Sequence, residues 1–322
     1  MPTYFLRKVD ESDFKEIAEL ESLLWGGEFS FRLEMIQWKC GDLHNSKYKG
    51  AVALENGKII GYRGIIHSEV KIQNKAFNLI HYTDAVVHPS YRGKRLLEKL
   101  NDFIMKTYEN CFDFTFIFFP NKVSGHIYRK QKNIDFITIN FFYRKIILPI
   151  PCREKYNLIS SLGDISDKII QVNQNSKAIT RFELSKKYLN WKLKEPNRKF
   201  LLIESKVIPE AVVLFEKKNK RIEILYVNYA VIDQCLMIVS NYSRNNFVLM
   251  IDFPLATLQE KLLKTNLNQF RFRKWIFLNQ FKKHFFSQKQ ILSKKVNENL
   301  SEEDENLFLN LENWNYQHII YV

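Results

Sequence analysis

The residues best suited to chemistry form a basic turn, Arg-Gly-Lys-Arg at positions 92–95, between a strand and a helix. β-branched residues before the turn predict a strand over 83–88, and apolar residues at helical spacing follow over 96–104. The turn is therefore a helix N-terminus, where the N–H groups of Gly93 to Leu96 and the helix dipole favour a phosphate or pyrophosphate. The cations that reinforce this field are Arg92, Lys94 and Arg95.

The alternative is an ordinary solvated turn. Lys and Arg at a helix N-terminus oppose the macrodipole at a cost of about 0.3–1 kcal/mol each. Three such cations in one turn therefore favour a bound anion.

The whole chain has the composition of a soluble globular protein. Its 322 residues fit two domains, and 46% of them are hydrophobic and 26% charged. The start carries no secretory signal, and Arg144 and Lys145 interrupt the longest apolar run, so we expect no transmembrane helix and a cytoplasmic location. The four cysteines lack the spacing of a metal site, so none is expected.

The net charge of +14 favours an anionic partner, but Lys, Asn, Ile and Phe are abundant together, as an AT-rich coding sequence alone would produce. Charge therefore carries little weight by itself.

Residues 1–148 alternate between helix and strand patterns in the order β-α-α-β-β-β-α-β-α-β. Asp10 and Asp13 are placed to cap the first helix, and Asn56-Gly57 is a strong hairpin signal. The helix after the basic turn, expected over 93–109, would connect two parallel strands of a mixed α/β sheet, with the turn at the carboxyl end of the first.

The remainder predicts a linker over 149–184 and a second domain over 185–322. The second domain repeats the order helix, three strands, helix, strand, helix, but it has no basic glycine turn. Residues 261–297 alternate cations with aromatics and contain no acidic residue. We interpret this stretch as core aromatics with a solvated face, although 270–286 would suit weak contact with a membrane surface.

Two motifs in residues 1–148 resemble those of the GNAT superfamily of acyl-CoA-dependent N-acyltransferases. The strand and turn over 86–95 are similar to the V-x-P-x-Y-R-G-K-G segment that wraps the coenzyme pyrophosphate. Residues 121–128 match the pattern N-x-x-[AS]-x-x-x-Y of a later helix. The resemblance implies a mixed central sheet of GNAT type and, with the repeated order, two tandem GNAT-like domains.

The resemblance also implies roles for individual residues. Tyr128 would donate a proton to the departing thiolate, although a core aromatic is the alternative, and Asn121 would bond the coenzyme or cap its own helix. A bulge near Val86 and Val87 would free an N–H to polarise the thioester carbonyl. The expected coenzyme-binding residues are Val86, Val87, Arg92, Gly93, Lys94, Arg95, Leu96, Asn121 and Ser124.

The general base is His81, Asp84 or water. His81 and Asp84 lie three apart on a strand, so their side chains should face opposite ways unless a bulge intervenes. The sequence also departs from the pattern, because Arg95 stands where the family carries a glycine that lets phosphate approach the backbone.

These observations predict an acetyl-CoA-dependent N-acetyltransferase that acts on a small amine by direct attack on the thioester. The two-domain architecture of this chain resembles that of enzymes in surface-polysaccharide pathways. The resemblance implies that the acceptor is an amino sugar or a nucleotide-linked amino sugar. It also implies that the second domain shapes the acceptor site. The alternatives are a Fem-like transferase that uses charged tRNA and an inactive GNAT-fold binding protein. Nucleic acid is not an expected partner.

Overall fold

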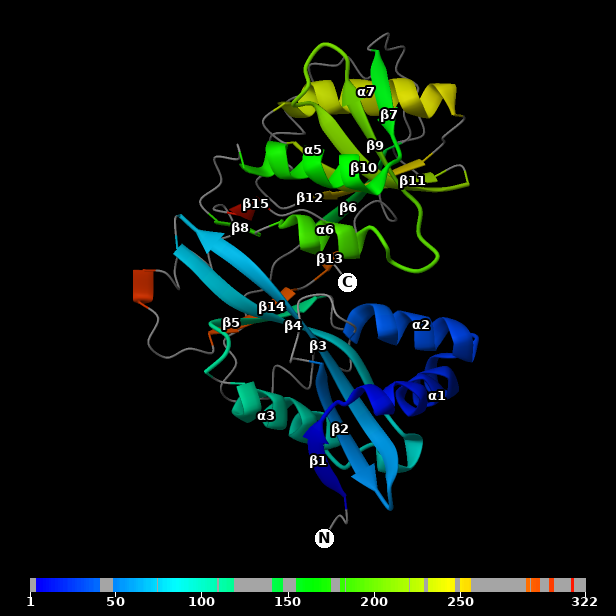
Figure 1. The fold of residues 1–322 in the computed structure, drawn as a ribbon, viewed down its shortest axis with the longest axis vertical. Coiled ribbons are helices and arrows are strands. Elements are labelled where there is room, and N and C mark those ends of the chain that lie inside the picture. The colour runs from blue at the N-terminus through cyan, green and yellow to red at the C-terminus, as the bar shows by residue number, and fades with distance from the viewer. Residues whose placement is uncertain are drawn as a thin grey trace. The chain divides into compact units, whose positions relative to one another are not determined.

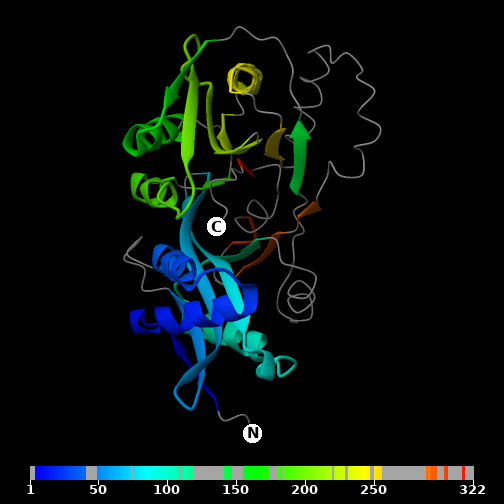
Figure 2. The same ribbon diagram turned by 90° about the vertical axis from the view of Figure 1, so that its right-hand side faces the viewer.

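The computed structural model divides into two compact units (Figures 1 and 2). The first consists of Met1–Thr138 and Ile291–Asn306, and the second of Ile139–Gln290 and Leu307–Val322. The structure describes residues 4–40, 49–73, 75–108, 110–118, 141–146, 155–174, 180–182, 184–219, 221–228, 231–246, 250–255, 288–289, 291–295, 301–303 and 314–315.

The first unit is built on a mixed sheet with strand order β1-β2-β3-β4-β5-β14. Neighbouring strands are antiparallel except β4 and β5, which are parallel and are joined through α3. The strands are β1 (Phe5–Lys8), β2 (Gly50–Glu55), β3 (Lys58–Ile72), β4 (Lys75–Val87), β5 (Phe114–Phe118) and β14 (Ile291–Lys295).

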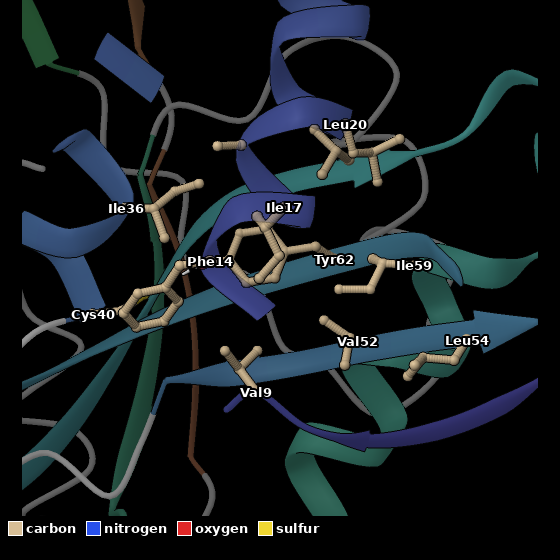
Figure 3. Close-up of a cluster of buried hydrophobic side chains, with 12 residues drawn as sticks. Val9, Phe14, Ile17, Leu20, Ile36, Cys40, Val52, Leu54, Ile59 and Tyr62 are labelled. Carbon is tan, nitrogen blue, oxygen red and sulfur yellow. Dashed lines mark hydrogen bonds between the residues drawn. The ribbon is translucent and has the colours of Figure 1, made fainter. Parts of the chain in front are cut away.

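Helices cover both faces of this sheet. On one face α1 (Phe14–Trp25) and α2 (Phe29–Cys40) bury apolar side chains against β2, β3 and β4. Figure 3 shows Ile17 of α1 and Ile36 of α2 in the cluster that includes Tyr62. On the other face α3 (Leu96–Tyr108) packs against β2 and β3.

Local sequence signals account for two of the connections. Asp10 caps the short 3-10 helix η1 (Glu11–Asp13), and the side chain of Asp13 accepts from the Asp10 N–H, which confirms the expected cap. Asn56 and Gly57 both have positive φ, 52° and 76°, as a two-residue hairpin turn requires.

The second unit contains a separate sheet with strand order β13-β6-β12-β11-β10-β9-β7. As in the first unit, three antiparallel strands, β9 to β11, lead through a helix, α7, to a strand parallel to the last of them. A further parallel pair joins β15 (Trp314–Asn315) to β8 (Thr180–Phe182). The other elements are β6 (Phe141–Ile146), β7 (Tyr156–Ile159), α5 (Leu162–Gln174), α6 (Lys186–Lys192), β9 (Phe200–Ser205), β10 (Val212–Lys218), β11 (Arg221–Val227), α7 (Ile232–Asn245), β12 (Met250–Leu255) and β13 (Gln288–Lys289).

The mixed α/β fold expected for the first part of the chain is confirmed. Strand β7, which falls inside the predicted linker 149–184, pairs with β9, and these residues are counted with the second unit. The helix expected to carry the motif 121–128 lies outside the described residues, as does most of the basic aromatic stretch 261–297.

No helix in the described part of the chain is long and apolar enough to cross a membrane. The described residues also contain no group of three or more His, Cys, Asp or Glu that could hold a metal ion. Cys40, Cys111 and Cys235 are free thiols.

Candidate active site

Strand β4 carries a bulge directly before the predicted coenzyme segment. Arg63 of β3 lies opposite Ala85, whereas Ile65 lies opposite Tyr82, so two steps along β3 match three along β4. The extra residue falls at Thr83–Asp84. A bulge leaves local backbone groups outside the regular ladder and re-aims side chains.

The same part of β4 also leaves its parallel partner. The ladder with β5 runs from the pair Leu79–Phe114 to the pair Tyr82–Ile117, and β4 then continues to Val87 along β3 only. Within the described residues, the edge of β4 that faces β5 is therefore unpaired from Thr83 onward. Such an edge can accept an extended ligand as if it were an adjoining strand.

A buried arginine fixes the bulge. The Nη1 of Arg63 donates to the carbonyl oxygen of Thr83 at 2.7 Å, and the guanidinium lies over the Tyr82 ring, 4.6 Å from its centroid. Arg63 is only 3% exposed. Sequence reasoning missed this residue, although a single cation within the apolar run 59–66 was a usable signal.

The basic turn follows β4 and leads into α3. Helix α3 begins at Leu96 rather than at the expected residue 93, because Gly93 and Arg95 both have positive φ, 75° and 58°. The N–H groups of Gly93, Lys94 and Arg95 make no backbone hydrogen bond to any described residue. They are therefore open to an anion.

The side chains around the turn leave these N–H groups accessible. Arg95 is exposed and turns toward Glu98, with Nε 2.5 Å from Oε2. Lys94 Nζ lies 4.9 Å from the Tyr91 ring centroid, and the Tyr91 hydroxyl donates to Glu55. The Leu96 side chain is buried in the α3 core, so only its backbone can meet a ligand.

His81 and Asp84 share the face of the sheet that carries α1 and α2. Ile80 and Tyr82 belong to the core under α3, so His81, which lies between them, faces the other side of the sheet. Asp84 accepts hydrogen bonds from Lys39 of α2, which places Asp84 on that same side. The bulge is the reason, because without it two residues three apart would face opposite ways.

The two candidate bases have different environments. His81 is 2% exposed, its Nε2 is hydrogen-bonded to Ser68 Oγ, and burial, with a smaller contribution from His67, lowers its pKa to about 3. Both carboxylate oxygens of Asp84 accept from Lys39 Nζ, at 2.9 and 2.7 Å. His81 is thus neutral at pH 7, and Asp84 is half of an ion pair.

Three predicted site residues cannot be placed with the rest. Asn121, Ser124 and Tyr128 lie outside the described residues. The structure brings together the other nine, which are His81, Asp84, Val86, Val87, Arg92, Gly93, Lys94, Arg95 and Leu96, along the second half of β4 and the turn that follows it.

A family comparison identifies the domain that contains these features. Residues 6–131 match the family model described as an acetyltransferase (GNAT) domain. This range includes the bulged strand, the basic turn and the first helix pair. The match covers the part of the chain whose motifs resemble the GNAT superfamily, and it supports a GNAT acetyltransferase domain there.

Solved structures share the fold over most of the chain. A probable N-acyltransferase from Enterococcus faecalis matches with a TM-score of 0.64 at 12% identity, covering 92% of this chain and 73% of that one. A GCN5-related N-acetyltransferase from Anabaena variabilis matches with a TM-score of 0.65 at 10% identity, covering 91% of this chain and 73% of that one. N-myristoyltransferase from Saccharomyces cerevisiae with bound myristoyl-CoA matches with a TM-score of 0.59 at 10% identity, covering 91% and 83%. Comparison with curated protein sequences finds no match.

Proposed function

We propose that the protein is an acetyl-CoA-dependent N-acetyltransferase whose coenzyme site lies in the first unit. One observation carries this proposal: β4 leaves its ladder with β5 at Tyr82, bulges at Thr83–Asp84, and runs into a turn with open N–H groups. The unpaired edge suits a pantetheine arm, and the turn suits a pyrophosphate. These residues therefore fit acyl-CoA.

The bound coenzyme would supply an acyl group already activated as a thioester. The residues of this chain position it and stabilise the negative charge that forms on the carbonyl oxygen when the amine attacks, through an N–H freed by the bulge. Arg63 holds the bulge carbonyl and so fixes where that N–H points. By resemblance, Tyr128 donates the proton that the departing thiolate needs.

The second unit is, in this proposal, a degenerate GNAT-like domain. The pairing of β10 with β11 changes register between Leu214 and Phe215, so Leu225 of β11 is an extra residue. Strand β11 is the one that corresponds to β4. The ladder of β11 with β12 covers Arg221 to Glu223 and ends before that bulge, just as the β4–β5 ladder does. The residues after β11 include no basic glycine turn, so coenzyme binding is assigned to the first unit alone.

The proposed acceptor is a small primary amine, and an amino sugar or nucleotide-linked amino sugar is the class we favour. The support is the resemblance of the two-domain architecture to enzymes of surface-polysaccharide pathways; the net charge of +14 agrees with a phosphate-bearing acceptor but carries little weight by itself. The neighbouring structure with myristoyl-CoA makes acyl length a second variable to test.

Free-thiol release tests both choices. The protein is incubated with acetyl-CoA or myristoyl-CoA and with amino sugars, UDP-linked amino sugars, polyamines or peptides. We expect acetyl-CoA with an amino sugar to give the highest turnover. Release with none of these acceptors would contradict the proposed activity, and preference for a peptide or for myristoyl-CoA would replace the proposed substrates.

The proposed acid has its own test. Tyr128→Phe should lower kcat while leaving acetyl-CoA affinity nearly unchanged, because a leaving-group acid acts only in the transition state. An equal loss of affinity, measured by calorimetry, would contradict that role.

A further inference from the structure

Three charged side chains gather on the α1/α2 face of β4, at the bulge. They are Glu21 of α1, Lys39 of α2 and Asp84 of β4. Lys39 and Asp84 form a direct ion pair with exposed fractions of 13% and 15%, whereas Glu21 is 2% exposed. Helix α1 packs over β3 and β4, so Glu21 interacts electrostatically with both members of the pair.

Glu21 differs from its two neighbours in its hydrogen bonding. Its Oε1 is buried and has no hydrogen-bond partner among the residues that the structure describes. Lys39 does not supply the missing donor, because its Nζ donates to the two oxygens of Asp84. A buried carboxyl oxygen without a donor is unfavourable, and in native proteins such a group is explained by a bound water or ion, by stored strain or by a catalytic role.

Comparison of the carboxyl and imidazole groups near the bulge singles out the same residue. His81 is bonded to Ser68 and is a weak base. Asp84 has both oxygens occupied by Lys39. Glu21 is the remaining group with an open oxygen, and it lies on the face toward which the bulge turns Asp84.

We propose that Glu21 receives the primary ammonium group of the acceptor beside the bulge and accepts its proton before attack. This inference rests on the proposed N-acetyltransferase function and adds the residue that handles the amine. Asp84 is already neutralised by its direct ion pair with Lys39, so among the described carboxyl groups at the bulge Glu21 is the one left to receive a cation.

The proton and electron balance is complete with the coenzyme as the only other reactant. One proton passes from the ammonium nitrogen to the Glu21 carboxylate. The freed lone pair forms the C–N bond, the C–S bond breaks, and its electron pair stays on sulfur. The nitrogen then loses a second proton. This proton either passes to the thiolate directly or restores the proton that Tyr128 has given to the thiolate. Glu21 finally releases its own proton to solvent.

The electrostatic environment of Glu21 suits this role. Burial, then repulsion by Asp84, raises its pKa to about 8, while Lys39 and Arg32 of α2 act in the opposite direction. Cys40 of α2 and Tyr62 of β3 lie close to these charged groups. Burial raises the pKa of the Cys40 thiol and of the Tyr62 phenol, so neither group ionises near pH 7. An arriving ammonium group would lower the pKa of Glu21, so that Glu21 is a carboxylate next to the ammonium whose proton it accepts.

The first arm of the test is kinetic. Glu21→Gln retains the shape of a protonated glutamate but cannot accept a proton, and Glu19→Gln, an exposed position on the same helix, is the matched control. With glucosamine and acetyl-CoA, we expect Glu21→Gln to lower kcat about 100-fold. It should also abolish the rise of kcat/KM through about pH 8, while Glu19→Gln resembles the parent.

The second arm needs no acceptor turnover. Infrared difference spectra between acidic and alkaline pH should show a protonated-carboxyl band that titrates well above the ordinary glutamate range in the parent and is missing in Glu21→Gln. Added methylammonium should lower that midpoint by about one pH unit or more. A parent without the band, a midpoint that methylammonium leaves unchanged, or a Glu21→Gln protein with parental kcat and pH profile would overturn the inference.

Calorimetry with acetyl-CoA separates this failure from failure of the proposed function. If the parent binds acetyl-CoA and Glu21→Gln retains both binding and turnover, the inference about Glu21 is wrong and the proposed function stands. If the parent does not bind acetyl-CoA, the proposed function fails, and with it the amine-receiving role.

Discussion

At the scale of single residues, Arg95 shows how this chain tolerates a departure from the usual glycine in the phosphate turn. Its φ of 58° lies in the left-handed region, which costs a residue other than glycine about 1–2 kcal/mol. The side chain does not fill the proposed anion site, because it forms an ion pair with Glu98. The conformation that glycine would adopt easily is therefore retained at a cost in stability, with the backbone N–H groups still open.

Arg95→Gly is expected to stabilise the first unit by about 1 kcal/mol, since it removes left-handed strain and only an exposed ion pair is lost. The readout is the free energy of unfolding in urea. Lys94→Gly is the control: Lys94 does not have positive φ, so glycine there should destabilise the protein by about 0.5–1 kcal/mol. Equal effects at both positions would contradict the strain argument.

Glu21 should make stability depend on pH. Its folded pKa, about 8, lies above the unfolded value, so the folded state binds more protons between about pH 4.5 and pH 8. The free energy of unfolding should therefore fall as pH rises through that window. Glu21→Gln should reduce this slope, measured by urea unfolding at several pH values, whereas parallel curves for parent and variant would show that Glu21 titrates normally.

At the scale of elements, the bulge of β4 is the feature on which the proposed chemistry depends. Arg63→Met should leave the half-buried Thr83 carbonyl without this donor, destabilise the first unit by about 1–3 kcal/mol, and lower kcat about tenfold or more. The KM for acetyl-CoA should change less, because the turn at 92–95 is intact. Arg63→Lys, which keeps one cationic donor, should recover part of kcat; no difference between the two variants would exclude a role for this hydrogen bond.

Strand β14 gives a second prediction at this scale. Residues Ile291–Lys295 pair antiparallel with β5, although they come from the far end of the chain. Ser293→Pro should destabilise the first unit, because proline has no N–H to donate and its ring disturbs the β14–β5 ladder. Ser293→Ala keeps the N–H and should leave the stability unchanged. Thermal unfolding of both variants is the readout, and equal melting temperatures would contradict the pairing.

The elements differ in how far the sequence could predict them. The capping box at Asp10–Asp13, the Asn56-Gly57 turn and the parallel crossover through α3 follow from local patterns, because each depends on residues close in the chain. The pairing of β14 with β5 depends on two segments more than 170 residues apart. No local periodicity contains that information.

The candidate site shows the same division. The basic turn is visible as a motif, but the late start of α3 follows from positive φ at Arg95, which residue type disfavours. The ion pair of Lys39 with Asp84 and the unpartnered oxygen of Glu21 arise from helix packing over a bulge whose position the sequence left open. Both depend on contacts between residues far apart in the chain.

At the scale of the whole molecule, the two units share a connectivity but differ in the turn that we propose binds the coenzyme. Both have three antiparallel strands, a crossover helix and a parallel strand, and in both the third strand bulges near the end of its parallel ladder. The first unit alone follows that strand with a basic turn containing glycine. We therefore predict one coenzyme site per chain.

Calorimetric titration of the intact protein with acetyl-CoA tests this central claim most directly. The account predicts one site with micromolar affinity in the parent, and equal or tighter binding in Arg95→Gly. Absence of binding in both proteins would contradict it. Binding seen only with Arg95→Gly would show that the arginine has abolished coenzyme binding and that the natural chain is a GNAT-fold protein without the transferase activity.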